Sequence, residues 1–270
     1  KRTVRGMHNK SLMARLMAAP HVVWSVLFIL APLAFVFYYA FTDKTGAFTL
    51  NNVKELGSAS YLDIFTRSLC FALAATAICL LVAYPLAYAI SRAKPRSQKI
   101  CIMLTMLPMW MNFLIRTYSI MAILEDTGFL NSLLGRIGLP PLHIINTGGA
   151  VIFGMVYNYL PYMVLPIYTV LSKLDNRLLE ASADLGCTPM QTFFKVIMPL
   201  SRSGVVSGVT MVFVPSVSTF YISQKLGGGK FQLIGDVIER QFQSAYNYNL
   251  GAAMSLVLMV LILLSLAVMN

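Results

Sequence analysis

The sequence contains very little charge. Asp, Glu, Lys and Arg together make up 11% of the 270 residues, whereas hydrophobic residues make up 57%. A soluble domain has about 25% charged and about 45–50% apolar residues. One water-exposed fold cannot cover so much apolar surface, so the composition predicts an integral membrane protein. The net charge of +11 would suggest nucleic acid in a soluble protein, but here the basic residues lie beside apolar runs, which indicates membrane topology and membrane lipid as a partner, and no nucleic acid.

The sequence also lacks the residue patterns of metal sites and of most enzymes. Three of the four cysteines lie inside apolar runs, no CxxC or Cys/His spacing is present, and the three histidines are scattered. No phosphate-binding GxxxxGK[ST] occurs, because the glycines and lysine of LGGGK (226–230) have neither its spacing nor its Ser/Thr. We therefore predict no metal site, no bound cofactor and no catalytic residues in this chain.

What the chain does have is a set of long uncharged runs. A helix that crosses a membrane needs about 20 mostly apolar residues. We expect an all-α membrane protein with a cytoplasmic segment at 1–21 and a six-helix domain at 22–270, without a cleavable signal peptide because the first run is too long and more runs follow it. The six predicted spans are 22–41, 68–91, 100–124, 144–172, 203–224 and 250–269.

The basic residues predict how these spans are oriented. With both termini inside, thirteen Lys and Arg residues fall on the cytoplasmic side and seven on the outer side. Four of the thirteen lie in the nine-residue loop at 91–99. Because cytoplasmic loops carry the excess of Lys and Arg, we expect an N-in/C-in topology. The segment at 173–199 then faces the cytoplasm, and the polar loop at 225–249 is external, either as a docking surface for a partner or as a plain connection.

The cytoplasmic segment at 173–199 has the signals of two short helices and a sharp turn. Asp175 can cap the first helix, and Gly186 stands where a left-handed residue ends it. Thr188-Pro189-Met190-Gln191 has the capping-box pattern for a second helix, which we expect Pro199 to end.

An amphipathic loop lying on the bilayer surface would show part of the same pattern. Glu180 and Asp184, one helical turn apart, count against that alternative because anionic lipid headgroups would repel them.

The stretch EASADLGCTPMQTFFKVIMPL (180–200) resembles the EAA signature of ABC importer permeases. The family pattern is Glu-Ala-Ala, three residues, Gly, nine residues, Ile, one residue, Leu-Pro, and the spacing here matches it. The sequence departs from it at Ser182, Val196 and Met198. Four further stretches resemble the spermidine/putrescine permease branch, and within it the first of two paired permease subunits; they are LVAYPLAYAISR (81–92), LPMWMNFLIRTYSIMAIL (107–124), YNYLPYMVLPIYTVL (157–171) and FVPSVSTFYISQKLGGGK (213–230).

This resemblance implies an ABC type I importer permease fold in the bacterial cytoplasmic membrane. It implies four kinds of partner: a homologous second permease, a homodimer of cytoplasmic ATPases that binds ATP and Mg, an extracytoplasmic substrate-binding protein, and membrane lipid. The 173–199 loop would be a coupling helix that docks on the ATPase, where Glu180 meets a basic residue, Ala181 and Ser182 permit close approach and Gly186 makes the turn. The coupling residues so implied are Glu180, Ala181, Ser182, Asp184, Gly186 and Pro199.

A polyamine cargo raises an electrostatic difficulty, because the six spans contain no Asp or Glu. An uncompensated charge at the bilayer centre costs about 2.5–3.5 kcal/mol or more. Aromatic ring faces can offset part of this at about 0.5–2 kcal/mol per cation, although packing or an interfacial belt explains aromatic residues equally well. The candidates for the substrate path are Trp110, Asn112, Tyr118, Glu125, Asp126, Tyr159, Tyr162, Phe220 and Tyr221.

Arg116 is the only charged residue within the six predicted spans. It lies four residues, or roughly 6 Å, beyond the midpoint Asn112 of a straight third span. We expect a structural role, in which the guanidinium bonds to helix carbonyls or to an acid of the partner permease. If the cargo were anionic, Arg116 would be its counter-ion. Another small organic cation, iron or an anion therefore remains open as the cargo, and a stand-alone secondary transporter remains open as the mechanism.

Overall fold

The computed structural model describes residues 19–269, which are mostly helical. Residues 1–18, and with them most of the predicted cytoplasmic segment 1–21, lie outside the described residues. Within residues 19–269 the only β pairing is a single bridge between Thr42 and Phe48. With η for a π-helical turn, the helices in chain order are η1 Val26–Leu30, α2 Ala31–Ala40, α3 Asn51–Glu55, α4 Ala59–Arg92, α5 Pro95–Trp110, α6 Phe113–Leu124, α7 Phe129–Arg136, α8 Gly148–Leu171, α9 Asn176–Asp184, α10 Pro189–Thr192, η2 Phe193–Ile197, α11 Met198–Leu200, α12 Arg202–Ser218, α13 Tyr221–Leu226, α14 Ile234–Gln243 and α15 Tyr248–Met269.

Four unbroken helices in residues 19–269 are long and apolar enough to cross a membrane. Two further spans are pairs of helices that meet at a bend, so the count reaches six when each pair is one span. The unbroken spans are Ala19–Ala40, Ala59–Arg92, Gly148–Leu171 and Tyr248–Val268.

The third predicted span, 100–124, is not one straight helix. Pro95–Trp110 and Phe113–Arg136 meet at an angle of 96°. Met111 between them has an extended backbone (φ −77°, ψ 148°), and Asn112 caps α6 by accepting hydrogen bonds from the N–H groups of Leu114 and Ile115. A short amide side chain that competes for backbone groups favours a helix start over a helix interior. Arg116 is therefore in the first turns of α6.

The fifth predicted span, 203–224, is also interrupted. α12 ends at Ser218, Thr219 is extended, and α13 starts at Tyr221. At its other end, the preceding helix ends at Leu200, and the chain bends by 66° before α12. The predicted end at Pro199 is thus confirmed to within one residue. Just before Pro199 lies the π turn η2, in which the N–H of Met198 bonds to the carbonyl of Phe193. This wider turn leaves space for the proline ring and does not need the N–H that proline lacks.

α4 begins nine residues before the predicted start of the second span and is 34 residues long. No proline or glycine stands between Ala59 and Ser68, and Asp63 and Arg67 form a pair one turn apart with 2.6 Å between the carboxylate and the guanidinium. At 1.5 Å per residue, α4 is longer than the roughly 30 Å hydrocarbon layer. Its first turns therefore extend beyond the membrane.

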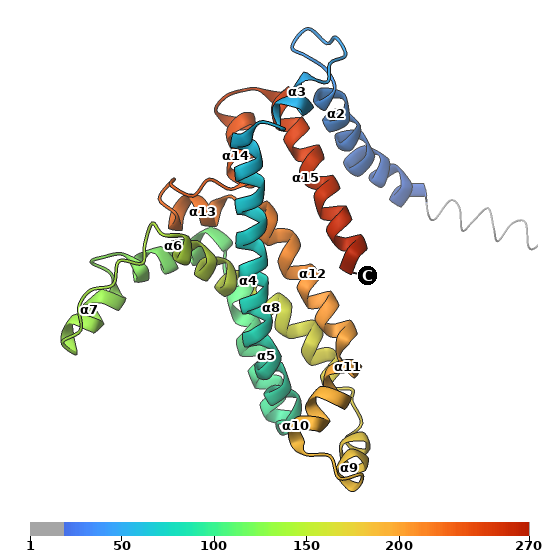
Figure 1. Cartoon of the computed structure of the whole chain (residues 1–270), viewed down its shortest axis with the longest axis vertical. Helices are drawn as coiled ribbons and strands as arrows, with labels where there is room; N and C mark the ends of the chain where they lie inside the picture. Colours follow the sequence, from blue (N-terminus) through green and yellow to red (C-terminus); the bar gives the residue numbers. More distant parts are fainter. Residues whose placement is uncertain (1–18, 270) are drawn as a thin grey trace, which may run out of the picture.

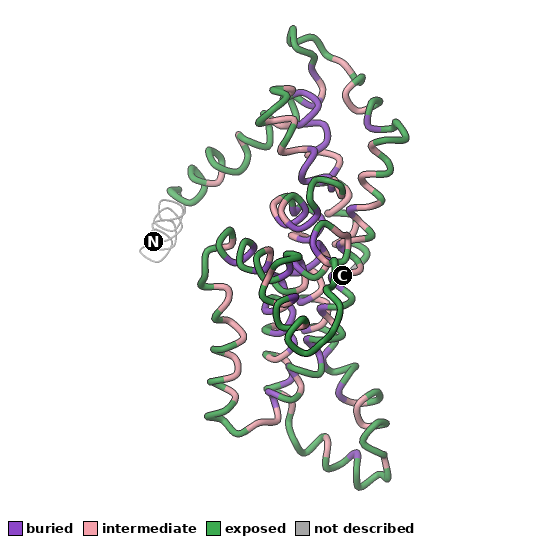
Figure 2. The backbone as a smooth tube through the Cα atoms, turned by 90° about the vertical axis from the view of Figure 1, so that its left-hand side faces the viewer, coloured by how far each residue is buried: buried purple, intermediate pink, exposed green. Residues whose placement is uncertain are grey.

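The centre of the molecule is a packed group of α4, α8 and α12 (Figure 1). α8 contacts both other helices, and Gly204 and Gly208 of α12 permit the approach. A Cβ at Gly204 would lie 2.9 Å from the carbonyl oxygen of Pro166. Small residues four apart are a common way for membrane helices to come close. Figure 2 shows that burial is concentrated in this centre, whereas the first helix is mostly exposed.

The two ends of the molecule differ in what they carry. α9 and α10 lie at one end, and α3 and α14 lie at the other (Figure 1). The turn between α4 and α5 lies at the α9–α10 end, so the loops predicted to be cytoplasmic share one end. This arrangement agrees with the alternating topology expected from the basic residues.

Candidate functional site

The segment 175–201, called the elbow below, has the predicted helix-turn-helix form. Asp175 caps α9 by accepting the N–H of Arg177 (3.0 Å). Gly186 makes the turn with φ +77°, a left-handed value that residues with a Cβ rarely adopt. Thr188 and Gln191 form the capping box of α10 in both directions, at 3.3 and 2.9 Å. The predicted caps and turn are confirmed.

The elbow presents apolar side chains to its surroundings at the end of the molecule. Leu185, beside the turn, is 85% exposed, and Met190 at the start of α10 is 67% exposed. Glu180, Ala181 and Asp184 are exposed as well. Large apolar side chains that project from a polar segment indicate a contact surface. Burying their apolar area against a partner would stabilise the contact by about 25 cal/mol per Å².

Ser182, which the EAA resemblance places at the ATPase, faces into the elbow. It is 5% exposed, and its hydroxyl donates to the carbonyl of Leu179 (2.8 Å). Because the hydroxyl proton of Ser182 is used in that bond, the hydroxyl of Thr192 is the donor in its 2.8 Å bond with Ser182 Oγ. In this chain Ser182 therefore holds the α9 side of the elbow to the α10 side.

The elbow is attached to α4 by an aromatic contact. The ring of Phe193 lies edge-on to Tyr84 and Tyr88, with centroid distances of 5.5 and 6.1 Å. Ser201 donates to Met198 O (3.0 Å), so the hydroxyl of Tyr84 is the donor in its 2.6 Å bond with Ser201 Oγ. Edge-to-face aromatic pairs are each worth about 0.5–1.5 kcal/mol beyond burial.

A second contact joins α4 to the start of α9. Arg92 Nη1 donates to Asn176 Oδ1 at 2.6 Å, and the guanidinium lies 5.6 Å from the ring centroid of Tyr88. Together Tyr84, Tyr88 and Arg92 form the elbow anchor, which the sequence reading missed. The available signal was their spacing, since residues 84, 88 and 92 recur every four positions on one face of a helix.

The structure brings two of the predicted path residues together in an outer aromatic cluster. Tyr118 of α6 and Tyr221 of α13 lie 6.0 Å apart between ring centroids, and Phe113 lies 6.0 Å from Tyr221. The missed residue is Lys225, whose Nζ lies 5.2 Å from the Tyr118 centroid and 5.7 Å from that of Tyr221. The two ring faces proposed for a cargo cation therefore already hold a cation of this chain. Lys225 lies one turn after Tyr221, a spacing visible in the sequence.

Arg116 makes the kind of contact that the structural interpretation predicted. The side chain is 5% exposed, and Nη1 donates to the carbonyl of Pro108 at 2.7 Å, while the guanidinium lies 5.8 Å from the ring of Phe113. The bond joins α6 to the end of α5 across their bend. Nε has no hydrogen-bond partner among the described residues.

The remaining path candidates are spread over the structure. Tyr159 is buried, donates to Pro215 O (3.4 Å) and lies 6.4 Å from the ring of Tyr162. Trp110 is 74% exposed, and none of the aromatic contacts in residues 19–269 includes it. Three others lie elsewhere. Glu125 directly follows the end of α6, and the carboxylate of Asp126 lies 2.7 Å from His143 Nδ1. Phe220 is 41% exposed at the break before α13.

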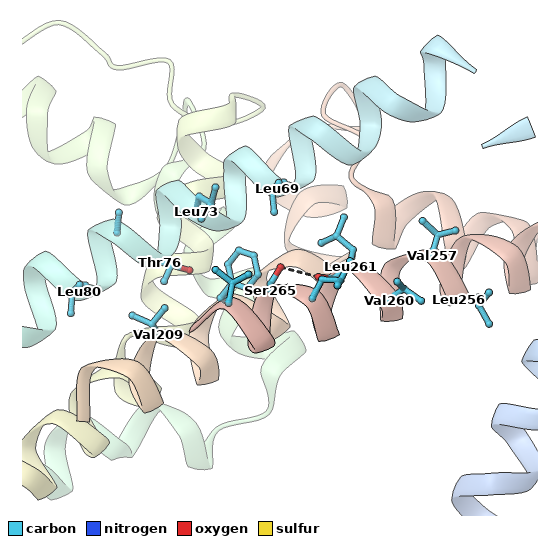
Figure 3. Close-up of a pocket in the computed structure, with 14 residues that line it drawn as sticks. Leu69, Leu73, Thr76, Leu80, Val209, Leu256, Val257, Val260, Leu261 and Ser265 are labelled. Carbon is cyan, nitrogen blue, oxygen red and sulfur yellow. Dashed lines mark hydrogen bonds between the residues drawn. The ribbon is translucent and has the colours of Figure 1, made fainter. Parts of the chain in front are cut away.

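A large groove of about 840 Å³ runs between α4, α12 and α15 (Figure 3). Its lining is leucine, valine, alanine and phenylalanine apart from two hydroxyls. Thr76 and Ser265 donate those hydroxyls to carbonyls of their own helices, Ala72 and Leu261, at 2.7 and 2.8 Å. No free polar group is left for a polar solute, so the groove suits lipid chains or another apolar helix. In residues 19–269 no three His, Cys, Asp or Glu side chains form a group that could hold a metal.

Comparison with known proteins places these features in a family. Residues 10–270 match the family model described as the inner membrane component of binding-protein-dependent transport systems. The chain is similar to the spermidine/putrescine transport system permease protein PotB of Haemophilus influenzae, with 39% identity over 249 residues that cover 89% of this chain and 87% of the relative. For PotB of Escherichia coli (strain K12) the identity is 37% over 255 residues, covering 92% and 93%.

Solved structures show the same fold. A bacterial alginate ABC transporter in complex with an alginate-bound periplasmic protein contains a chain with a TM-score of 0.78 at 15% identity, covering all of this chain and 96% of that one. The predicted type I importer permease fold is confirmed, and a stand-alone transporter is excluded. The chain belongs to the inner membrane components of binding-protein-dependent transport systems, and it is a multi-pass, non-catalytic permease subunit of a bacterial ABC importer that depends on a partner ATPase.

Proposed function

We propose that this permease subunit moves polyamines such as spermidine and putrescine across the bacterial inner membrane. The observation that carries the proposal is the 37–39% identity to spermidine/putrescine permeases over about nine tenths of both chains. The outer aromatic cluster supports it, because Tyr118 and Tyr221 already contact an ammonium group, that of Lys225, with their rings. A cargo amine would meet the same ring faces.

The proposed assembly contains a homologous second permease, two copies of a cytoplasmic ATPase that bind ATP and Mg, and an extracytoplasmic binding protein. The elbow is the proposed ATPase contact. Leu185 and Met190 supply exposed apolar area, and Glu180, Ala181 and Asp184 surround it with acidic and small side chains. Closure of the ATPases would move the elbow, and the elbow anchor would pass that movement to α4. The transporter thus has two states biased by nucleotide on one side.

Uptake by the reconstituted complex tests the proposed cargo. Labelled spermidine should accumulate with ATP, and putrescine should compete where sugars and phosphonates do not. The Glu180→Lys complex should lose assembly or transport, since a basic side chain replaces the acid expected at the ATPase. Uptake by this chain alone, without an ATPase, would contradict the proposal.

An anionic cargo is the second candidate, favoured by two cations near the break between α5 and α6. No carboxylate lies within salt-bridge distance of Arg116 or Lys225 in the described residues. Competition of spermidine uptake by dicarboxylates, or uptake of dicarboxylates in place of spermidine, would favour this candidate.

A further inference from the structure

Asp236 is an acid that lies outside the predicted spans and is nevertheless buried. It occupies the first turn of α14 and is 4% exposed. Oδ2 accepts the N–H of Leu233 at 2.8 Å, which starts the helix. Oδ1 has no hydrogen-bond partner among the described residues. A buried polar atom without a partner costs about 1–3 kcal/mol, and more when it is charged, so Oδ1 calls for a donor that the described chain does not supply.

Two of the donors next to Asp236 make bonds to other groups. The hydroxyl of Ser223 donates to the carbonyl of Phe220 at 2.8 Å, and the amide of Gln224 donates to Glu239 Oε2 at 3.1 Å. The hydroxyl of Ser68, from α4, accepts the N–H of Ile234 at 2.7 Å and donates to the carbonyl of Ile64 at 2.7 Å. None of these groups bonds Oδ1 in the structure, and a ligand with several N–H donors would satisfy it.

A cavity of about 150 Å³ lies beside Asp236. Its polar lining comes from Ser223, Gln224, Gln232, Asp236, Glu239, Arg240 and Ser244. Since one water occupies about 30 Å³ of liquid, the space is of the order of five waters. That volume accommodates an ammonium group with a short alkyl arm, and it excludes a sugar ring with its hydration shell.

The charges around the cavity favour a cation. Asp236 and Glu239 are acidic, and Arg240 is the one basic residue of the lining. The nearest basic residue on α4, Arg67, is paired with Asp63. Burial raises the pKa of Asp236 to about 6, against the opposing effects of the Leu233 N–H, the Ser223 and Gln224 side chains and the Arg240 charge. A bound cation would favour the ionised carboxylate and lower that pKa.

The cavity and the outer aromatic cluster share one helix, α13. This six-residue helix carries Tyr221 and Lys225 of the cluster as well as Ser223 and Gln224 of the cavity. We propose that the cavity between α13 and α14 binds a primary ammonium group through Asp236 and Glu239. The inference rests on the proposed function only where it identifies this ammonium as one end of the cargo. Asp236 would hold that end at the outer face before the cargo passes Tyr118 and Tyr221.

Infrared difference spectra of the purified complex test the binding site without transport. At pH 5 Asp236 is mostly protonated, so adding butylamine, the probe, should remove the C=O band of a buried carboxylic acid. Butanol of similar size should not. The band change should be absent in Asp236→Asn, reduced in Glu239→Gln, and kept in the control Glu55→Gln, which alters an exposed acid on α3. No band change in the wild type, or the same change in Asp236→Asn, would overturn the site and leave the cavity to water.

Transport kinetics then separate the site from the cargo. Loss of a charge-assisted bond predicts a KM for spermidine about 10- to 100-fold higher in Asp236→Asn, with a nearly unchanged maximal rate. Glu239→Gln, at a partly exposed residue, should raise KM less and provides the test if Asp236→Asn does not assemble. Normal KM in both variants refutes the assignment of this ammonium to the cargo while the polyamine function stands. If the complex takes up no polyamine but still binds butylamine in a way that depends on Asp236, the proposed function is refuted and the binding site stands.

Discussion

The elbow and the outer aromatic cluster are organised by different kinds of interaction. The elbow consists of local signals, since each cap and turn is completed by residues within a few positions of one another. The outer cluster joins Tyr118 to residues more than a hundred positions away, Tyr221 and Lys225. Substitutions in the elbow should therefore act on local geometry and coupling, whereas substitutions in the cluster should act on cargo affinity.

The largest effect is expected at Phe193, where the elbow contacts the elbow anchor. Phe193→Ala removes both aromatic contacts with Tyr84 and Tyr88, and a Phe→Ala change in a packed site costs about 3–5 kcal/mol, less here because Phe193 is only partly buried. We expect transport to fall at least about tenfold while the ATPase still binds and hydrolyses ATP. Uptake and ATP hydrolysis measured on one preparation check this. Phe193→Leu, which keeps apolar volume, should be milder, and equal losses of hydrolysis and uptake would contradict the coupling role.

The next effect concerns the pH dependence of stability at Asp236. Burial raises its pKa from 3.8 to about 6, so its contribution to stability is complete below about pH 4 and is lost as the pH rises through 6. The ionised side chain then costs roughly 2–3 kcal/mol at pH 7.5. Asn does not titrate, so without amine the melting temperature of Asp236→Asn minus that of the wild type should rise from pH 5 to pH 7.5. A difference that is constant or falls would refute the buried, unpaired carboxylate.

A smaller effect is expected from Gly186→Ala. A Cβ at Gly186 meets no atom within 4 Å, so the cost is the left-handed backbone alone (φ +77°), about 1–2 kcal/mol. The elbow should open more often, which limited proteolysis of the purified complex would detect as faster cleavage near residue 186. Gly135→Ala is the matched control, because its Cβ also meets nothing within 4 Å while it lies within α7. Faster cleavage in both variants would show that the faster proteolysis has a cause other than backbone strain at residue 186.

The smallest effect is expected at Lys225. Lys225→Met removes the ammonium that contacts the rings of Tyr118 and Tyr221, and it keeps a side chain of similar length. One cation contact is worth about 0.5–2 kcal/mol, so KM for spermidine should fall about 2- to 30-fold. Lys225→Arg should leave it near the wild-type value. A rise in KM, measured by uptake, would contradict competition between Lys225 and a cationic cargo and would favour the anionic candidate.

Several features were predictable because the signal lies within one turn or one span. The capping box at Thr188 and Gln191, the turn at Gly186 and the uncharged runs are of this kind. The prediction of one helix for the third span was wrong, because hydropathy does not detect a capping residue such as Asn112, whose amide starts a new helix inside an apolar run.

The sequence by itself determined the solvent and topology of this protein. Its scarcity of charge demands a membrane, where every backbone group must be bonded within helices, and its basic residues orient those helices. Only the tertiary structure decided which side chains meet: Phe193 with Tyr84, Lys225 with Tyr118, and Asp236 with the polar cavity beside α13. These contacts join segments that are distant in sequence, and no periodicity encodes them, because the partner of a side chain depends on how the bent helices pack.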